Sequence, residues 1–155
     1  MDWVILLRWL HVIGACVLLG TGAGIAFFML MAHRTRAPAT IAAIAHIVVT
    51  ADYVFTLSAV IAQPITGALL AHALGYALTE PWLLASYALY LFTGAFWVPV
   101  VFMQRRMRDL ARAAAASGGA LPAEYFTLYR RWFWCGFPAF AAVLAIVWLM
   151  LSRQL

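Results

Sequence analysis

Four long apolar runs divide this sequence, and each can cross a lipid bilayer as a helix. A transmembrane helix needs about 20 mainly apolar residues in a row. Hydrophobic residues make up 67% of the chain and charged residues 10%, whereas soluble domains contain roughly 25% charged residues. One soluble core is too small to bury this much apolar surface, and no run alternates as a barrel strand does.

The sequence therefore predicts an all-α integral membrane protein, a four-transmembrane-helix bundle that forms a single domain over residues 1–155. We expect the helices near residues 3–32, 40–73, 82–110 and 123–152.

The basic residues predict how the bundle is oriented. The chain has no lysine, and its arginines gather in two of the three connections between the runs. The remaining connection, Gly75–Pro81, holds no basic residue and one acid, Glu80. Cytoplasmic loops carry the excess of basic residues, so both termini are expected outside. The arginines concerned are Arg34, Arg36, Arg105, Arg106, Arg108, Arg112, Arg130 and Arg131.

His11 is the first candidate for chemistry, because ionisable groups inside a membrane are costly. It lies about 12 Å below the start of its helix, at about 1.5 Å per residue. The small residues Gly14 and Ala15 follow on the same face and open space beside the imidazole. A flat macrocycle with His11 as axial iron ligand fits that space, and Arg8, one turn earlier, would then pair with a propionate. The alternatives are an imidazole hydrogen-bonded across a tight helix seam and an arginine that extends to lipid headgroups.

Three further histidines extend the haem hypothesis. His72 ends the second run in the same half of the membrane as His11, so we include it with the candidate cofactor-binding residues. His33 and His46 share the other half, which permits a two-haem arrangement like that of four-helix cytochromes b. His11 and His33 are, however, about 33 Å apart along one helix, roughly the whole hydrocarbon core of about 30 Å. At least one of them must then be interfacial.

Asp52 is the second candidate, since it falls near the middle of the second run. Thr56 and Gln63 follow it on one helix face and form a polar stripe that must face protein or water. Such a stripe suits a proton relay or a small polar cavity. The alternative is a protonated carboxyl that bonds a hydroxyl of the third run, from Ser86, Tyr87 or Tyr90.

The pair Gln63-Pro64 predicts a kink in the second helix and a freed backbone carbonyl. The chain contains no nucleotide loop, zinc signature or nucleophile elbow. Its two cysteines, Cys16 and Cys135, have no paired spacing. No catalytic residue is predicted.

The chain resembles a bacterial family of predicted integral membrane proteins, domain-of-unknown-function family 2269. The resemblance covers nearly the whole chain and implies a multi-pass protein of the bacterial inner (plasma) membrane, but no activity. It rests on Arg8, His11, Gly14, Gly20, Gly22, Ala51, Asp52, Phe55, Thr56, Gln63, Pro64, Thr66, Gly67, Trp82, Tyr90, Trp97, Pro99, Arg106, Asp109, Trp132, Phe133, Pro138 and Phe140.

A weaker resemblance is to the HemJ-type family, the four-helix haem-binding protoporphyrinogen oxidases of many bacteria. That family carries Leu-His early in its first helix, and Leu10-His11 matches it. The resemblance implies haem b bound through His11. The family's third helix carries Trp-Leu-x-x-Lys with an essential lysine, whereas here Ser86 stands at the matching position after Trp82. Haem binding is therefore implied, and the oxidase activity is not.

Two functions follow from these residues. The first is a haem-b-binding membrane protein for electron transfer or porphyrin-related redox chemistry, with His11 as iron ligand. The second is a non-enzymatic module centred on Asp52, either a proton- or ion-linked transporter-like bundle or an accessory subunit. The expected partners are the lipid bilayer and either a second copy of the chain or a membrane redox partner, with no nucleic acid.

Overall fold

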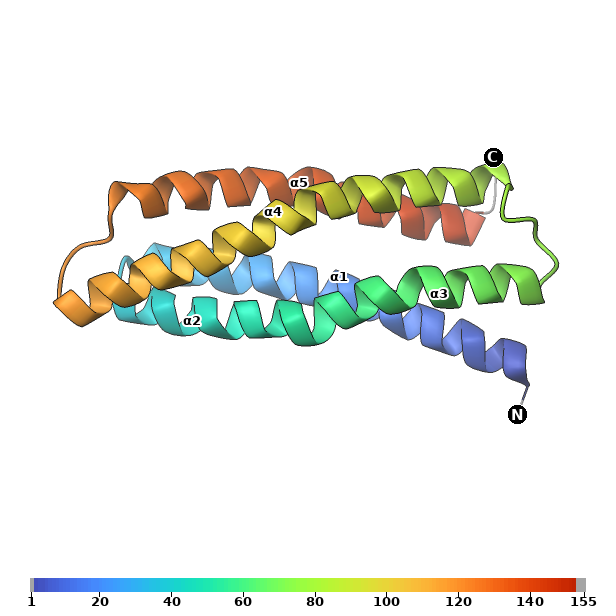
Figure 1. The fold of residues 1–155 in the computed structure, drawn as a ribbon, viewed down its shortest axis with the longest axis horizontal. Helices are drawn as coiled ribbons and strands as arrows, with labels where there is room; N and C mark the ends of the chain where they lie inside the picture. The colour runs from blue at the N-terminus through green and yellow to red at the C-terminus, as the bar shows by residue number, and fades with distance from the viewer. Residues whose placement is uncertain (1, 153–155) are drawn as a thin grey trace.

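The computed structural model describes residues 2–152, and within them the regular structure is entirely helical (Figure 1). Four of its helical segments are long and apolar enough to cross a membrane. The second of them runs unbroken through two α-helices and a short π-helix. The predicted fold, an all-α bundle of four membrane-spanning helices, is therefore confirmed. The elements are α1 (Trp3–Thr35), α2 (Pro38–Ala51), η1 (Asp52–Thr56), α3 (Leu57–Ala73), α4 (Pro81–Ser117) and α5 (Ala123–Ser152).

Two helix boundaries differ from those expected from the sequence. The second span begins at Pro38 rather than residue 40, because a proline suits the first turn of a helix, where no N–H is needed. The third span continues to Ser117 rather than residue 110, and it ends at Gly118, whose φ is +64°. Residues 111–116 are nearly all alanine, the strongest helix former, so this helix extends past its apolar run.

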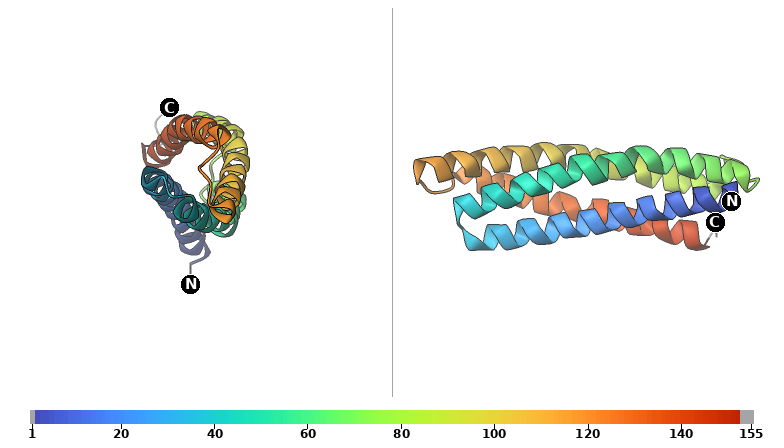
Figure 2. Two further views of the ribbon diagram at one scale, coloured as in Figure 1. Left: turned by 90° about the vertical axis from the view of Figure 1, so that its left-hand side faces the viewer. Right: turned by 90° about the horizontal axis from the view of Figure 1, so that it is seen from below.

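The four spans are arranged side by side around a common axis (Figure 2). Helix α4 packs along α5 and α2, and α1 packs along α2 and α3, whereas α1 and α5 contact each other only lightly. The main apolar core lies between α1, α2, α4 and α5, and its fully buried members include Met29, Ile41, Met107 and Tyr125. A much smaller cluster around Trp82 closes the opposite end. The bundle is therefore dense at one end and looser toward the other.

Many large apolar side chains lie on the outer surface of the bundle. Large side chains such as Leu91, Phe102 and Trp148 are more than 60% exposed. Soluble monomers rarely expose extensive apolar patches, whereas a lipid-facing surface has no such restriction. The protein is an integral membrane protein whose outer face contacts the acyl chains.

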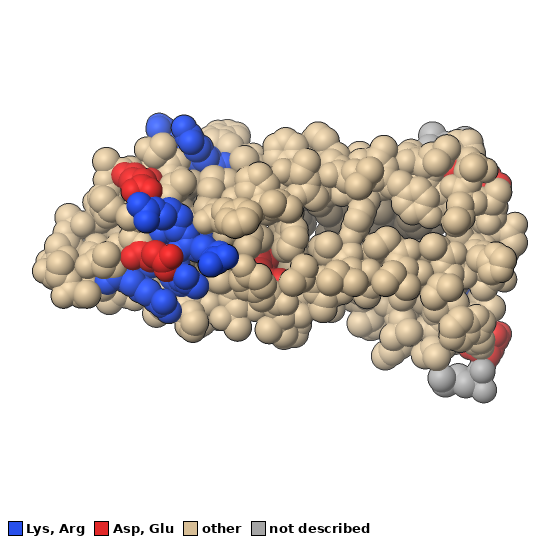
Figure 3. Space-filling view, viewed as in Figure 1, with Lys and Arg blue, Asp and Glu red and all other residues tan. Residues whose placement is uncertain are grey.

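The arginine side chains on the face shown in Figure 3 gather at one end of the molecule. There Arg106 forms a two-point ion pair with Glu124, with N–O distances of 2.7 and 3.0 Å, which joins α4 to α5. Most of the arginines lie in the helix ends next to the loops α1–α2 and α4–α5, and both loops lie at this end. The orientation argument from the sequence assumed that most arginines lie on one side of the membrane, and the structure places them at one end of the bundle. The outside position of both termini stays a prediction.

Candidate functional site

His11 lies where α1 crosses α3, and two hydrogen bonds join the helices there. Its Nδ1 is 2.9 Å from Thr66 Oγ1. Gln63 Nε2 donates a hydrogen bond of 2.7 Å to the backbone carbonyl oxygen of His11. The cross-helix hydrogen bond that the sequence offered as one alternative for His11 is thus present, and it occupies only one ring nitrogen.

Two glycines allow this close approach. A Cβ atom on Gly14 would lie 2.3 Å from Gln63 Nε2, and one on Gly67 would lie 3.0 Å from His11 Cε1. Each helix therefore presents a glycine to the polar side chain of the other. Gly14 therefore allows the close contact between α1 and α3, in addition to leaving space beside His11.

The protonation of His11 follows from its partner. Thr66 Oγ1 lies 2.8 Å from the carbonyl oxygen of Ala62 and donates its hydrogen back into its own helix. A hydroxyl has one hydrogen and two lone pairs, so toward His11 it accepts. The Nδ1 atom therefore carries the ring proton, and Nε2 keeps a free lone pair. This tautomer is the one in which Nε2 can bind a metal ion.

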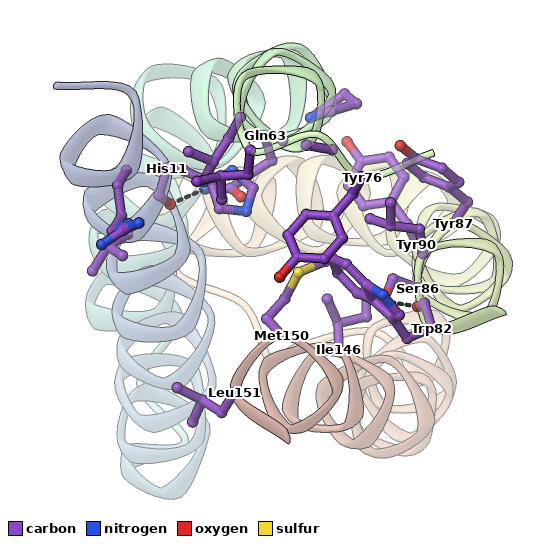
Figure 4. A pocket seen from close by; sticks show the side chains of 18 residues that line it. His11, Gln63, Tyr76, Trp82, Ser86, Tyr87, Tyr90, Ile146, Met150 and Leu151 are labelled. Carbon is purple, nitrogen blue, oxygen red and sulfur yellow. Dashed lines mark hydrogen bonds between the residues drawn. The ribbon is translucent and has the colours of Figure 1, made fainter. Parts of the chain in front are cut away.

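A cavity of about 280 Å³ lies beside His11, and Figure 4 shows its walls. Arg8 and His11 line it from α1, and Gln63 lines it from α3. Helix α5 contributes Ile146 and Met150. The aromatic wall lies mainly on α4 and the loop before it, as Tyr76, Trp82, Tyr87 and Tyr90.

Two predicted site residues lie elsewhere than expected. His72 is exposed and is not among the residues that line the His11 cavity, so the structure does not pair these two histidines. Ser86 is buried in the wall of the His11 cavity, where its hydroxyl donates to Trp82 O at 2.7 Å. Ser86 and Asp52, which the sequence analysis placed in one polar site, therefore line different cavities in the structure.

The predicted carbonyl freed by a proline is that of Val60. Pro64 has no N–H, so the Val60 carbonyl loses the donor that a helix would supply four residues later. The Tyr90 hydroxyl of α4 donates a hydrogen bond to this oxygen instead. Tyr90 therefore completes the backbone bonding of α3 rather than bonding to Asp52.

Asp52 occupies a second site, at the start of the π-helical turn within the second span. Residues Asp52–Thr56 form a π-helix, in which the N–H of Leu57 bonds the carbonyl of Asp52. Single π-turns occur frequently at functional sites. Asp52 is only 3% exposed, and Trp97 Nε1 donates a hydrogen bond of 3.4 Å to its Oδ1. Thr56 and Gln104 also face this carboxyl.

A larger cavity, of about 420 Å³, lies beside Asp52 in the middle of the bundle. Thr56 and Gln63 both line this cavity, as expected for residues of the predicted polar stripe. Tyr90 lines this cavity and the His11 cavity, so it lies at the boundary between them. Two polar residues of the Asp52 cavity, Trp97 and Gln104, were not predicted as partners of Asp52.

The structure does not bring the other two histidines together. His33 stacks on Tyr129, with ring centroids 3.6 Å apart, and its Nδ1 lies 3.3 Å from the hydroxyl of Tyr125. His46 is exposed on the outside of the bundle. The inner pair therefore does not face a shared cavity, and the two-haem arrangement loses its geometric basis.

Residues 5–154 match the family described as "Predicted integral membrane protein (DUF2269)". The chain belongs to this family. No curated protein and no solved structure matches it. Family membership agrees with the apolar outer surface and names no activity, and the resemblance to HemJ-type proteins stays a prediction.

Replacing Gly14 with alanine tests the α1–α3 seam. The new Cβ must displace Gln63 from the His11 carbonyl, so we expect a loss of about 1–3 kcal/mol in the free energy of unfolding. Gly20→Ala is the matched control, because a Cβ there meets nothing within 4 Å. Unfolding in mixed detergent micelles measures both variants, and equal stabilities would contradict the close contact.

Proposed function

We propose that this membrane protein binds haem b in the His11 cavity, with His11 Nε2 as an axial ligand of the iron. The observation that carries the proposal is the hydrogen-bond pattern around His11. Metal-ligating histidines almost always donate their other ring N–H to an oxygen atom, which fixes the tautomer and the ring orientation. Thr66 supplies that oxygen, and His11 lines the cavity with Nε2 available.

The other lining residues fit the same group. Arg8 supplies a cation for a propionate, and the aromatic wall around Trp82 suits an apolar macrocycle. Met150 lines the cavity from α5, and a thioether opposite a histidine is an established axial pair. Haem would supply an iron that changes oxidation state. The lining residues of the chain would hold the haem in place and exclude water from the cavity.

The size of the cavity sets one condition on this proposal. At about 280 Å³ its volume is slightly below the range of ligand sites, which is roughly 300–1,000 Å³. A macrocycle requires a wider cavity, and α1 and α5, which both line it, contact each other only lightly. The proposal therefore includes a separation of this seam when haem enters from the membrane.

In the proposed setting, the bacterial inner membrane, the His11 cavity lies away from the end where most of the arginines gather, and Arg8 is the one arginine among the described residues that line it. With both termini outside, that is the outer half of the bilayer. The site then exchanges electrons with a membrane partner or serves porphyrin-related redox chemistry.

The visible spectrum of the detergent-purified protein during titration with haemin tests the proposal. We expect a saturable Soret band at one haem per chain, and sharper bands after reduction with dithionite. A chain that stays colourless at excess haemin would overturn the proposal. A transport or accessory function centred on Asp52 predicts that outcome and predicts no dependence on His11.

Thr66→Val is expected to lower haem affinity about 10- to 100-fold, because loss of such an outer partner typically weakens a metal site by that factor. The change keeps the shape of the side chain and removes the acceptor for Nδ1. Thr50→Val is the matched control, since Thr50 bonds only the carbonyl of His46 in its own helix and is exposed. Haemin titrations of both variants measure the effect, and an unchanged affinity in Thr66→Val would show that Nδ1 needs no partner.

A further inference from the structure

The Asp52 cavity contains three buried polar oxygens without a hydrogen bond among the described residues: Asp52 Oδ2, Thr56 Oγ1 and Gln104 Oε1. Their residues are 3%, 7% and 1% exposed, respectively. Each unsatisfied buried polar group costs about 1–3 kcal/mol, and native proteins contain few of them. Three around one carboxyl group, beside a cavity of about 420 Å³, indicate a site built for a ligand.

The charge of this site is the first guide to the ligand. Asp52 is an acid, and no lysine, arginine or histidine is among the described residues that line the cavity. A buried carboxylate without a counter-charge is strongly unfavourable. A cationic ligand would supply the missing charge.

The hydrogen-bonding groups are the second guide. All three oxygens can accept hydrogen bonds, so a ligand that donates would satisfy them. The buried indole N–H of Trp132, which also lacks a hydrogen bond and lines the same cavity, is the one free atom among the described residues there that can only donate. A primary ammonium group has three N–H donors, one for each oxygen. A metal ion such as Ca²⁺ requires about six to eight oxygen ligands, more than this cluster offers, and a neutral hydroxyl group donates only once.

The walls are the third guide, because they are apolar and aromatic. Trp97, which bonds Asp52, lines the cavity together with Trp132, Phe133, Phe137 and Phe140. Aromatic rings attract cations through their π faces and provide an apolar surface for the rest of the molecule. An alkyl or aryl chain that carries the ammonium group would fit this space.

We propose that the Asp52 cavity is a binding site for a lipophilic primary ammonium ion, held by Asp52, Thr56 and Gln104 with its apolar part against the aromatic wall. This site is separate from the His11 cavity and does not depend on haem. The class of ligand follows from the carboxyl group of Asp52, the neutral oxygens of Thr56 and Gln104, and the aromatic wall.

Fluorine NMR with 2-(4-fluorophenyl)ethylammonium as the probe tests this inference on the purified full-length protein, with empty micelles as the blank. We expect saturable binding, and at least about tenfold weaker binding of 2-(4-fluorophenyl)ethanol, which lacks the charge. The N,N,N-trimethyl analogue, which keeps the charge and lacks the N–H donors, should also bind at least about tenfold more weakly. Equal binding of the alcohol or of the trimethyl compound would overturn the proposal, as would no binding at all.

Variants of the chain give an independent arm. Asp52→Asn is expected to weaken the ammonium probe at least about tenfold, and Thr56→Val is expected to weaken it by a smaller factor. Asp109→Asn is the matched control, because it removes a carboxylate that lies far along α4, at its arginine-bearing end. Comparable losses in Asp52→Asn and Asp109→Asn would mean that surface charge attracts the probe, and the proposal would fail. The comparison of the three probes on the unaltered protein stays decisive even where Asp52→Asn fails to fold.

Discussion

His11→Ala is expected to abolish the Soret band that haemin titration produces in the unaltered protein. The change removes the Nε2 lone pair that we assign to the iron, and the described residues place no other histidine in that cavity. Added imidazole should restore the band, because it enters the space left by the side chain and supplies the same nitrogen. Spectra before and after the addition of imidazole measure both effects.

The chain offers two matched controls for this result. His46→Ala and His72→Ala each remove one imidazole, but both side chains are exposed away from the cavity. They should keep the full Soret intensity. If either control loses the Soret band, or if His11→Ala keeps it, the residue that binds the haem iron is not His11 alone. Because His11 also bonds Thr66 across the helix seam, the unfolding free energy of His11→Ala must be compared with that of Thr66→Val, which lacks the same bond.

The fold could be predicted because the bilayer fixes both the length and the composition of a spanning helix. An apolar segment of about 30 residues satisfies its backbone hydrogen bonds in lipid by forming a helix, so each of the four apolar runs forms one membrane-spanning helix. The π-turn at Asp52–Thr56 could not be predicted in this way. It adds one residue to a turn without changing local composition, and its position depends on the packing of Asp52 against α4.

The two sites were predictable to different depths. His11 and Asp52 stood out because ionisable side chains are rare in such a sequence. Their neighbours depend on how two antiparallel helices align. Asp52 lies 21 residues before the end of α3 at Ala73, or about 32 Å along the axis. The same depth in α4 falls near residue 102, which brings Trp97 and Gln104 level with Asp52 and leaves Ser86 near the His11 cavity.

Tyr90→Phe is expected to destabilise the protein by about 1–3 kcal/mol, because it leaves the Val60 carbonyl without a donor inside the membrane. The oxygen has no alternative partner in its own helix, where Pro64 occupies the donor position. Tyr87→Phe is the control on the same wall of the His11 cavity, and it should change stability by less than about 0.5 kcal/mol. Equilibrium unfolding in mixed micelles measures both variants.

A double-mutant cycle with Pro64→Ala tests whether the hydroxyl acts through that carbonyl. Alanine restores the backbone N–H four residues after Val60, so the helix can bond the oxygen itself. In the Pro64→Ala background, Tyr90→Phe should lose most of its effect, with a coupling energy of about 1–2 kcal/mol. An undiminished effect would mean that Tyr90 stabilises the bundle through another contact. The expected coupling identifies Tyr90 as the residue that makes a proline tolerable in α3, at the boundary between the His11 and Asp52 cavities.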